Sequence, residues 1–363
     1  PSKTRVVAER RMRSARMRIA IFLPNWIGDV VMATPAVRAV REAFPDGRMV
    51  GVHKAYARGV IDGAPWFVDL FTSVAGVLAV ARRLRAERFD VAILFPNTFR
   101  SALTAWLGGC RRRIGYRRYG RGRLLTDVLE PVSDARGRLK PSPIIDAYNR
   151  LAERAGATPT RRMELFTTAD DEATADTIWS RCGFRRRREV VCLNPGAAFG
   201  SSKHWSVDAF AEVARRFVAE RGSGVLVLCG PGERELARQI VVRAGSENVR
   251  SLAEVPPSLG LTKACVRRCD LLVTTDSGPR HFAAAFDRPV VTLFGPTHVA
   301  WTETFYAKAV HLQKEVECGP CQQRVCPLDH RCMTRLTSDE VYAAARELLV
   351  RFPSTSREAR HAV

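Results

Sequence analysis

The stretch LPNWIGDVVMATPAVRAV, residues 23–40, joins a short apolar run to a helical pattern. The run that leads into it, IAIFLP, is typical of a buried strand, and Thr34 followed by Pro35 predicts a helix N-cap and a first-turn proline. A turn that only reversed the chain would not need the lone carboxylate of Asp29. That carboxylate either caps the helix or takes part in chemistry, and the turn alone leaves both interpretations open.

Strand-like runs alternate with amphipathic helical patterns along the rest of the chain. After MRIAIFLP come MVGVHKA and DVAILFPN, and the layout restarts with VVCLNPG, GVLVLCG, DLLVTTD and PVVTLFGP. This alternation predicts an α/β protein with two doubly wound, Rossmann-like domains facing a cleft, where the carboxyl ends of the strands meet. We expect a basic, disordered head at 1–16, an N-terminal domain at 17–165, a linker region at 166–188, a C-terminal domain at 189–350 and a flexible tail at 351–363.

The composition is that of a globular protein with a strong positive charge. Of the 363 residues, 46% are hydrophobic and 26% are charged, and the formal net charge is +21. Such a field gathers acidic partners, and we expect acidic small molecules or lipids rather than nucleic acid. No stretch of the sequence approaches the roughly 20 apolar residues that span a bilayer. We therefore expect a cytoplasmic protein that at most rests on a membrane surface.

Three loops of the second half follow predicted strands and carry residues suited to a nucleotide. NPGAAFGSSKHW at 194–205 ends in hydroxyls and a lysine at a helix entrance, which suits a phosphate. TTDSGPRHFAAAF at 274–286 repeats this layout, and LVLCGPGERE at 226–235 offers a carboxylate for ribose hydroxyls but lacks the third glycine of a dinucleotide fingerprint. A solvated lysine and a structural histidine are the plain alternatives. The binding candidates are Ser201, Ser202, Lys203, Glu233, Asp276, Ser277, Gly278 and His281.

The first half carries a cluster of arginines after a predicted strand. FPNTFRSALTAWLGGCRRRIGYRRYGRGRLL places Asn97 and Arg100 directly after the strand, and the cluster that follows includes Arg113. Guanidinium groups suit a phosphorylated, carboxylate-bearing lipid head group. A run of arginines is also often a solvated face.

Four of the ten cysteines lie close together, at Cys318, Cys321, Cys326 and Cys332. Their number and spacing fit a tetrahedral zinc site or, less well, an iron-sulfur cluster. Four reduced thiols packed in a small loop are the alternative, since the paired CxxC repeat of a zinc ribbon is missing. Any zinc here would be structural.

Taken together, these motifs resemble one family. GD after the first strand, NPGAAFGSSKHW, DSGPRHFAAA with PVVTLFGPT, and CGPCQQRVCPLDHRCM occur in the order found in the ADP-heptose:lipopolysaccharide heptosyltransferases, glycosyltransferase family 9. The resemblance runs from about residue 17 to 349 and is greatest to the second heptosyltransferase. It implies a GT-B architecture with the acceptor held by the N-terminal half and ADP-heptose by the C-terminal half. The implied reaction is inverting heptosyl transfer with no cofactor required for catalysis.

The resemblance also implies roles for single residues. Asp29 matches the acidic residue of the Gly-Asp motif and would be the base, and Lys203 matches the lysine that faces the donor phosphates. Inversion needs a base for the acceptor hydroxyl and stabilisation of the departing diphosphate. Asp276, Ser277, Gly278 and His281 match the donor diphosphate loop, Glu233 matches a ribose-binding glutamate, and the acceptor-binding candidates are Asn25, Asn97, Arg100 and Arg113.

The implied partners are ADP-heptose, the anionic inner core of lipopolysaccharide and the cytoplasmic face of the inner membrane, with no nucleic acid. Two alternatives remain at this point. Another GT-B nucleotide-sugar transferase or an epimerase would share the architecture, because a fold alone does not fix a substrate. A zinc-dependent nucleic-acid-binding protein would use the charge and the cysteines, but it would leave Asp29 and Lys203 without a purpose.

Overall fold

The computed structural model describes residues 17–73 and 76–353, and the chain separates into two compact units. The first unit comprises the described residues up to Glu164 together with 300–304, and the second comprises 165–299 and the described residues from 305 onward. The predicted head at 1–16 and most of the predicted tail lie outside the described residues.

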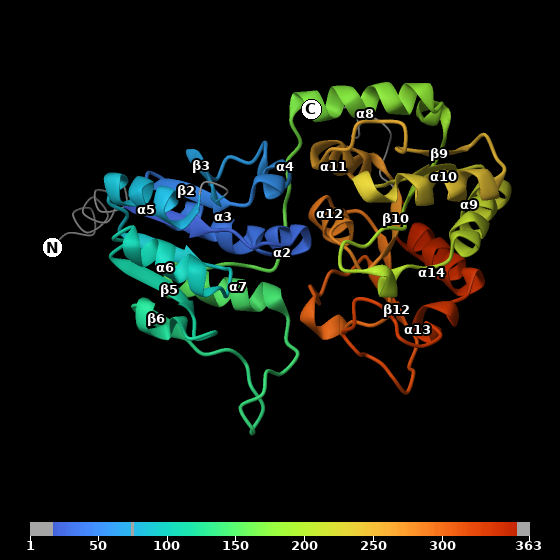
Figure 1. The fold of residues 1–363 in the computed structure, drawn as a ribbon. Coiled ribbons are helices and arrows are strands. Elements are labelled where there is room, and N and C mark those ends of the chain that lie inside the picture. The colour runs from blue at the N-terminus through green and yellow to red at the C-terminus, as the bar shows by residue number, and fades with distance from the viewer. Residues whose placement is uncertain (1–16, 74–75, 354–363) are drawn as a thin grey trace. The chain divides into compact units, whose positions relative to one another are not determined.

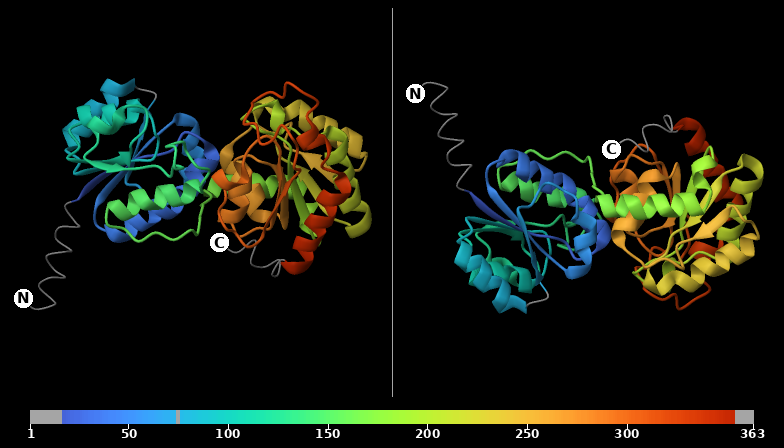
Figure 2. Two further views of the ribbon diagram at one scale, coloured as in Figure 1. Left: turned by 90° about the horizontal axis from the view of Figure 1, so that it is seen from below. Right: turned by 90° about the horizontal axis from the view of Figure 1, so that it is seen from above.

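The first unit is a parallel sheet with helices on both faces (Figures 1 and 2). Its elements are β1 (Arg18–Phe22), α2 (Ile27–Met32), α3 (Thr34–Ala43), β2 (Arg48–His53), η1 (Ala55–Ala57), α4 (Arg58–Ile61), β3 (Asp69–Thr72), α5 (Gly76–Glu87), β4 (Val91–Leu94), α6 (Phe99–Leu107), β5 (Arg112–Tyr116), η3 (Arg121–Leu124), β6 (Asp127–Leu129) and α7 (Ile144–Arg154). The strand order is β3-β2-β1-β4-β5-β6, and every neighbouring pair is parallel. Helices α3 and α7 pack together on one face, and α5 and α6 pack together on the other.

Helix cover on both faces explains why the central strands are continuous apolar runs. Val50, Leu84 and Leu94 are fully buried in one core cluster of this unit. The turn after β1 differs from the prediction, because a separate short helix, α2, fills it. Thr34 therefore lies inside α3 rather than capping it, and its hydroxyl donates to Val31 O at 2.8 Å, while Pro35 stands in the first turn as predicted.

The second unit repeats the same topology. Its elements are α8 (Ala169–Arg181), η4 (Phe184–Arg186), β7 (Val190–Asn194), η5 (Ser201–Lys203), α9 (Val207–Arg221), β8 (Gly224–Val227), η6 (Pro231–Glu233), α10 (Arg234–Ala244), β9 (Val249–Ser251), α11 (Leu259–Arg268), β10 (Leu271–Thr275), α12 (Pro279–Ala285), β11 (Val290–Phe294), β12 (Ala309–Gln313), α13 (Arg331–Thr334) and α14 (Ser338–Arg351), while η7 (Val299–Trp301) crosses the division between units. The strand order is β12-β11-β10-β7-β8-β9, again all parallel. The predicted class, α/β with two Rossmann-like halves, is confirmed.

Residues 166–188, which we expected to link the halves, contain α8 and belong to the second unit. The reason is electrostatic. The Arg268 guanidinium on α11 is 5% exposed and donates to Glu172 Oε2 and Asp176 Oδ1 of α8, each at 2.6 Å. The acidic character of the segment, visible in the sequence, therefore fixes the helix onto the second sheet unit.

Both sheets reverse their winding between two central strands, β1 and β4 in the first unit and β7 and β10 in the second. Ligands of doubly wound folds bind beyond the carboxyl ends of the strands at such reversal points. Across residues 17–73 and 76–353, no helix is both long and apolar enough to span a bilayer.

Candidate functional site

The predicted site residues follow the strands that flank the two reversal points, apart from Glu233, Arg113 and the four clustered cysteines. Asp29 lies in the segment after β1 and Arg100 in the segment after β4. Lys203 lies in the loop after β7, and Asp276 directly follows β10. Chain segments diverge at such points, so side chains there can surround a ligand without competing with the core. The fold therefore offers one candidate binding edge in each unit.

Asp29 is held by a tyrosine and does not act as the helix cap. Trp26 occupies the N-cap position of α2, and Asp29 stands in the first turn, half-buried. The Tyr148 hydroxyl, on α7, donates to Asp29 Oδ1 at 3.1 Å. Burial, and then the neighbouring Asp29 carboxylate, raise the pKa of Tyr148 well above its ordinary value, so the phenol keeps its proton. Asp29 is therefore not the N-cap of α2, and the Tyr148 hydroxyl orients its carboxylate.

A pocket in the first unit brings together residues that follow β1, β2, β3 and β4. Asn25 and Arg100, both acceptor candidates, line it. Lys54, directly after β2, lines it as well and was not predicted. Within the described residues, the buried Ser73 hydroxyl of this pocket has no hydrogen-bond partner. The pocket thus carries two cations and an unsatisfied hydroxyl, which suits a polar anionic ligand.

Asn97 belongs to the frame of this pocket. Its Oδ1 accepts from Arg121 Nη2 at 2.9 Å. The Arg121 side chain is fully buried and also donates to Tyr116 O at 2.9 Å and Ser101 Oγ at 3.2 Å. Burial, and then the nearby Arg118, lower the pKa of Arg121 to about 10, so it remains charged at neutral pH. Arg121 therefore fixes the segment after β4, and Asn97 contributes to that bracing.

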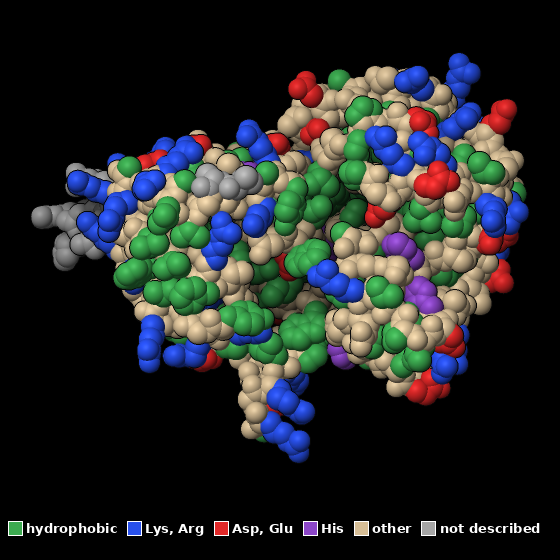
Figure 3. All heavy atoms as spheres, in the orientation of Figure 1, with side chains coloured by type: hydrophobic (Ala, Val, Ile, Leu, Met, Phe, Trp, Pro, Cys, Tyr) green, Lys and Arg blue, Asp and Glu red, His purple; other side chains and the backbone are tan. Residues whose placement is uncertain are grey.

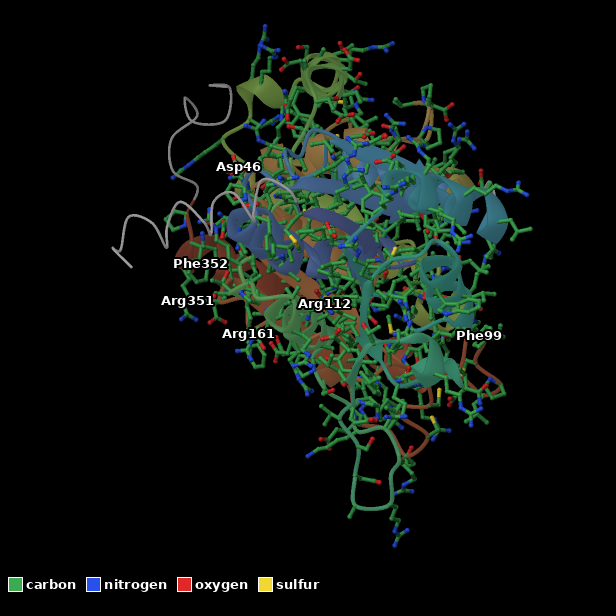
Figure 4. The ribbon with its side chains drawn as sticks, turned by 90° about the vertical axis from the view of Figure 1, so that its left-hand side faces the viewer. Asp46, Phe99, Arg112, Arg161, Arg351 and Phe352 are labelled. Atoms are coloured by element: carbon green, nitrogen blue, oxygen red, sulfur yellow. The ribbon has the colours of Figure 1, made fainter. Side chains whose placement is uncertain are left out.

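Arg113 also has a structural environment. Its guanidinium donates to Leu124 O and Cys110 O, both at 2.6 Å. Two other arginines of the unit, both labelled in Figure 4, also have partners within it: Arg112 forms an ion pair with Asp127 at 2.9 Å and Arg161 forms one with Asp146 at 2.7 Å. Part of the arginine cluster thus satisfies carbonyls and carboxylates of the fold itself.

The second unit holds a buried carboxylate between two cations. The Lys203 side chain donates to the Asp276 carboxylate and, at 3.0 Å, to Asp276 O. Arg280 Nη1 lies 3.4 Å from Asp276 Oδ1, and Thr297 Oγ1 donates to Asp276 Oδ2 at 2.7 Å. Lys203, Asp276 and Arg280 are 7%, 6% and 3% exposed. These three side chains together are two cations and one carboxylate, and the third hydrogen of the Lys203 ammonium can donate to a ligand oxygen.

This charge pattern decides the protonation of the neighbouring groups. Burial would raise the pKa of Asp276, but Lys203 and Arg280 outweigh it and hold the pKa below the ordinary value. Burial, followed by the charge of Arg280, lowers the pKa of His281 well below its ordinary value. His281 is therefore a neutral imidazole, and the positive charge of the site comes from Lys203 and Arg280.

Other candidates surround this centre from neighbouring loops. Ser277 Oγ accepts from Asn194 Nδ2 at 2.9 Å, and Gly278 is the N-cap of α12. Glu233 Oε2 accepts from Gly230 N at 2.8 Å. A Cβ on Gly196 would lie 1.9 Å from the Glu233 carboxyl, so only glycine allows this approach. The loops after β7, β8 and β10 therefore lie close together, and that they bind a nucleotide stays a prediction.

The two serines before Lys203 differ in environment. Ser201 is exposed, whereas Ser202 is 1% exposed and donates through its hydroxyl to Gln323 O at 2.6 Å. Ser201 is thus open to a ligand, and Ser202 is engaged by the chain.

The four clustered cysteines occupy a surface loop. Cys318 and Cys321 are exposed, Cys326 is half-buried and Cys332 is buried. Burial raises the pKa of Cys332, and the other three cysteines, which lie nearby, raise it further. Within 17–73 and 76–353, no group of three or more His, Cys, Asp or Glu side chains is arranged to hold a metal ion.

Sequence reasoning missed several residues of the site. Lys54, Asn194 and Thr297 each stand at or just after the carboxyl end of a strand, and this position was the available signal. Arg280 adjoins His281 in the predicted loop, but nothing in the sequence shows that its side chain turns inward to Asp276. Tyr148 had no signal, since it comes from a helix 119 positions after Asp29.

Comparison with known proteins shows that this chain is similar to heptosyltransferases. A family model described as glycosyltransferase family 9 (heptosyltransferase) matches residues 77–331. Lipooligosaccharide heptosyltransferase 2 of Campylobacter jejuni is 27% identical over 342 residues, which cover 92% of this chain and 98% of that protein. Lipopolysaccharide heptosyltransferase 2 of Salmonella typhimurium is 27% identical over 303 residues, covering 81% and 87%. The solved structure of E. coli ADP-heptose lps heptosyltransferase II has a TM-score of 0.77 at 24% identity, covering 93% of this chain and all of that one.

Proposed function

The chain belongs to glycosyltransferase family 9 (heptosyltransferase) and is a glycosyltransferase, and from this premise we propose that it moves heptose from ADP-heptose to the inner core of lipopolysaccharide. The names of the similar proteins from Campylobacter and Salmonella support addition of the second heptose. The observation that carries the proposal is the buried Asp276 between Lys203 and Arg280, because two buried cations beside one carboxylate suit the binding of a diphosphate. Family membership favours glycosyl transfer over an epimerase or a zinc-dependent nucleic-acid binder.

We assign the donor to the second unit. The third hydrogen of Lys203, the Ser201 hydroxyl and the backbone amides of Ser277 and Gly278 would bind the diphosphate, and Glu233 the ribose. The positive charge and the backbone amides of this site stabilise the negative charge that develops on ADP as its bond to the sugar breaks. His281 is neutral and contributes at most a hydrogen bond, so its role differs from that of a cation.

We assign the acceptor to the first unit, with Asn25, Lys54 and Arg100 around the pocket. Asp29 accepts the proton of the acceptor hydroxyl while that oxygen forms a bond to the anomeric carbon. The bond from that carbon to the diphosphate oxygen breaks on the opposite side, and ADP leaves with the bonding electrons. Tyr148 donates to Asp29 Oδ1 and so orients the carboxylate that receives the proton.

Transfer is tested with purified protein, ADP-heptose and heptosylated inner core, with the product read by mass spectrometry. The expected result is one added heptose with the wild type and none with Asp29→Asn, which still binds ADP. Absence of transfer by the wild type, or equal transfer by Asp29→Asn, would refute the proposal. A panel of other nucleotide sugars separates heptosyl transfer from a related transferase, because ADP-linked donors alone should raise the melting temperature strongly.

Contact with the cytoplasmic face of the inner membrane is proposed from the segment between β6 and α7. This segment, 131–143, projects at the bottom of Figure 3 and bears exposed Arg136, Arg138 and Lys140. Exposed Val132 and Leu139 lie on the same segment. Basic groups near an anionic lipid surface each add about 1 kcal/mol of attraction. Sedimentation with phosphatidylglycerol vesicles should retain the wild type and lose a variant with all three basic residues changed to glutamate; equal retention would refute the contact.

A structural zinc ion at Cys318, Cys321, Cys326 and Cys332 stays a separate prediction, and catalysis as derived above uses none of these residues. Elemental analysis of the purified protein decides it. One zinc per chain that is lost in Cys326→Ser would support the prediction, and zinc far below one per chain after purification in its presence would refute it.

A further inference from the structure

The Cys-rich loop, residues 318–332, is hydrogen-bonded to the lysine loop, residues 195–205, through Ser202. The Ser202 backbone N–H donates to Arg324 O at 3.1 Å, and its hydroxyl donates to Gln323 O at 2.6 Å. The Nε2–H of His330 donates to Ser202 O at 2.6 Å. All three polar groups of the residue next to Lys203 therefore bond to one other segment of the chain.

The approach of the two loops is close enough to restrict their residues. A Cβ on Gly200 would lie 2.2 Å from Arg324 O, so the lysine loop can reach this carbonyl only with glycine there. His330 has a backbone φ of 61°, in the left-handed region that non-glycine residues rarely adopt, and this conformation accompanies its hydrogen bond to Ser202. Such conformations persist where surrounding contacts over-determine them.

The Cys-rich loop also bonds to the segment after β11, which in turn holds Asp276. Gln322 N donates to Pro296 O at 2.8 Å, and Thr297, the next residue, donates to the Asp276 carboxylate at 2.7 Å. Both segments that position the buried Lys203–Asp276 pair are therefore bonded to the same loop. The lysine loop itself has only the three-residue helix η5, and so short a 3-10 helix has little stability of its own.

We propose that the Cys-rich loop is a clamp that sets the position of Lys203, with Ser202 and His330 as positioning residues for donor binding. The inference rests on the proposed function, in which Lys203 binds the donor diphosphate. It reassigns Ser202 from a ligand of the donor to a residue that acts through its neighbour. It also gives the Cys-rich loop a role that does not depend on a metal ion.

Kinetics of His330→Ala and Ser202→Ala test the clamp, with donor KM measured at saturating acceptor and acceptor KM at saturating donor. Loss of one such hydrogen bond should raise donor KM about fivefold while acceptor KM stays unchanged. His330→Gln, which keeps a donor near the position of Nε2, should restore most of the loss. Leu328→Ala is the matched control, because Leu328 lies in the same loop and is 60% exposed.

Two outcomes would overturn the clamp: an unchanged donor KM in both alanine variants, or equal rises in donor and acceptor KM. Melting curves show which variants fold, and Ser202→Ala decides the matter if His330→Ala does not fold. Calorimetry of ADP binding to Lys203→Met separates this proposal from the previous one. If Lys203→Met binds ADP as the wild type does, the assigned donor site is wrong; if it binds ADP weakly while both clamp variants bind normally, only the clamp is wrong.

Discussion

Removing the negative charge of Asp276 should destabilise the second unit strongly. The variant Asp276→Asn keeps the shape of the side chain and can still accept from Thr297 Oγ1. It removes the negative charge of Asp276 from beside the buried Lys203 and Arg280, which are 7% and 3% exposed. Breaking a buried pair by removing one partner costs about 3–5 kcal/mol. Because the amide retains a hydrogen bond, we expect about 3 kcal/mol, or a melting temperature lower by roughly 6–12 °C.

Thermal and urea unfolding of the two proteins measure this cost, and Asp287→Asn provides the control. Asp287 also pairs with a lysine, Lys308, at 2.6 Å, but its side chain is 72% exposed. Water screens that pair, so its loss should cost less than about 1 kcal/mol. The double variant Lys203→Met with Asp276→Asn should recover part of the stability, because only one of the two cations beside position 276 then remains.

Two further measurements connect this stability to the proposed function. ADP should raise the melting temperature of Asp276→Asn by more than that of the wild type, because diphosphate supplies the missing negative charge. The pKa of Asp276 is held below its ordinary value of 3.8, so its contribution is present above that pH and is lost as the pH falls through the lower, folded-state pKa. The difference between the proteins should thus be constant from pH 7 to about pH 5 and shrink only in stronger acid. A melting temperature of Asp276→Asn within about 2 °C of the wild type would refute the reasoning.

Four other substitutions address the first unit. Asp29→Asn should lower kcat by about 10²–10⁴-fold and leave ADP affinity unchanged in calorimetry, and a kcat within tenfold of the wild type would argue against a base. Tyr148→Phe keeps the ring packing on Phe95, at 5.1 Å between centroids, but removes the donor to Asp29; kcat should fall about tenfold with donor KM unchanged, and an unchanged kcat would contradict the orienting role. Lys54→Ala should raise acceptor KM about tenfold. Arg113→Ala should instead lower the melting temperature and leave acceptor KM unchanged. The reverse pattern would exchange the roles assigned to these two residues.

The sequence by itself determined the fold class and the edge at which the site lies. Strand-helix alternation with polar, glycine-containing segments after the strands specifies doubly wound sheets, and such segments must lie at the carboxyl edge whatever the packing. Asp29, Lys203 and Asp276 could therefore be placed after their strands from the sequence, because the sequence order around each is local. The acidic segment at 166–188 was visible too, but its affinity for the second unit depended on Arg268, some 90 positions away.

Only the tertiary structure decided which partner each polar side chain takes. Hydrogen bonds and ion pairs are set by distances of about 3 Å between groups far apart in the chain, and local patterns carry no information on them. Tyr148 and Asp29 meet across 119 positions, and Ser202 and Gln323 across 121. For the same reason Arg113 and Ser202, whose side chains could bind a ligand, instead bond to carbonyls of the fold. Arg280 turns inward, and its charge lies with that of Lys203 beside one buried carboxylate.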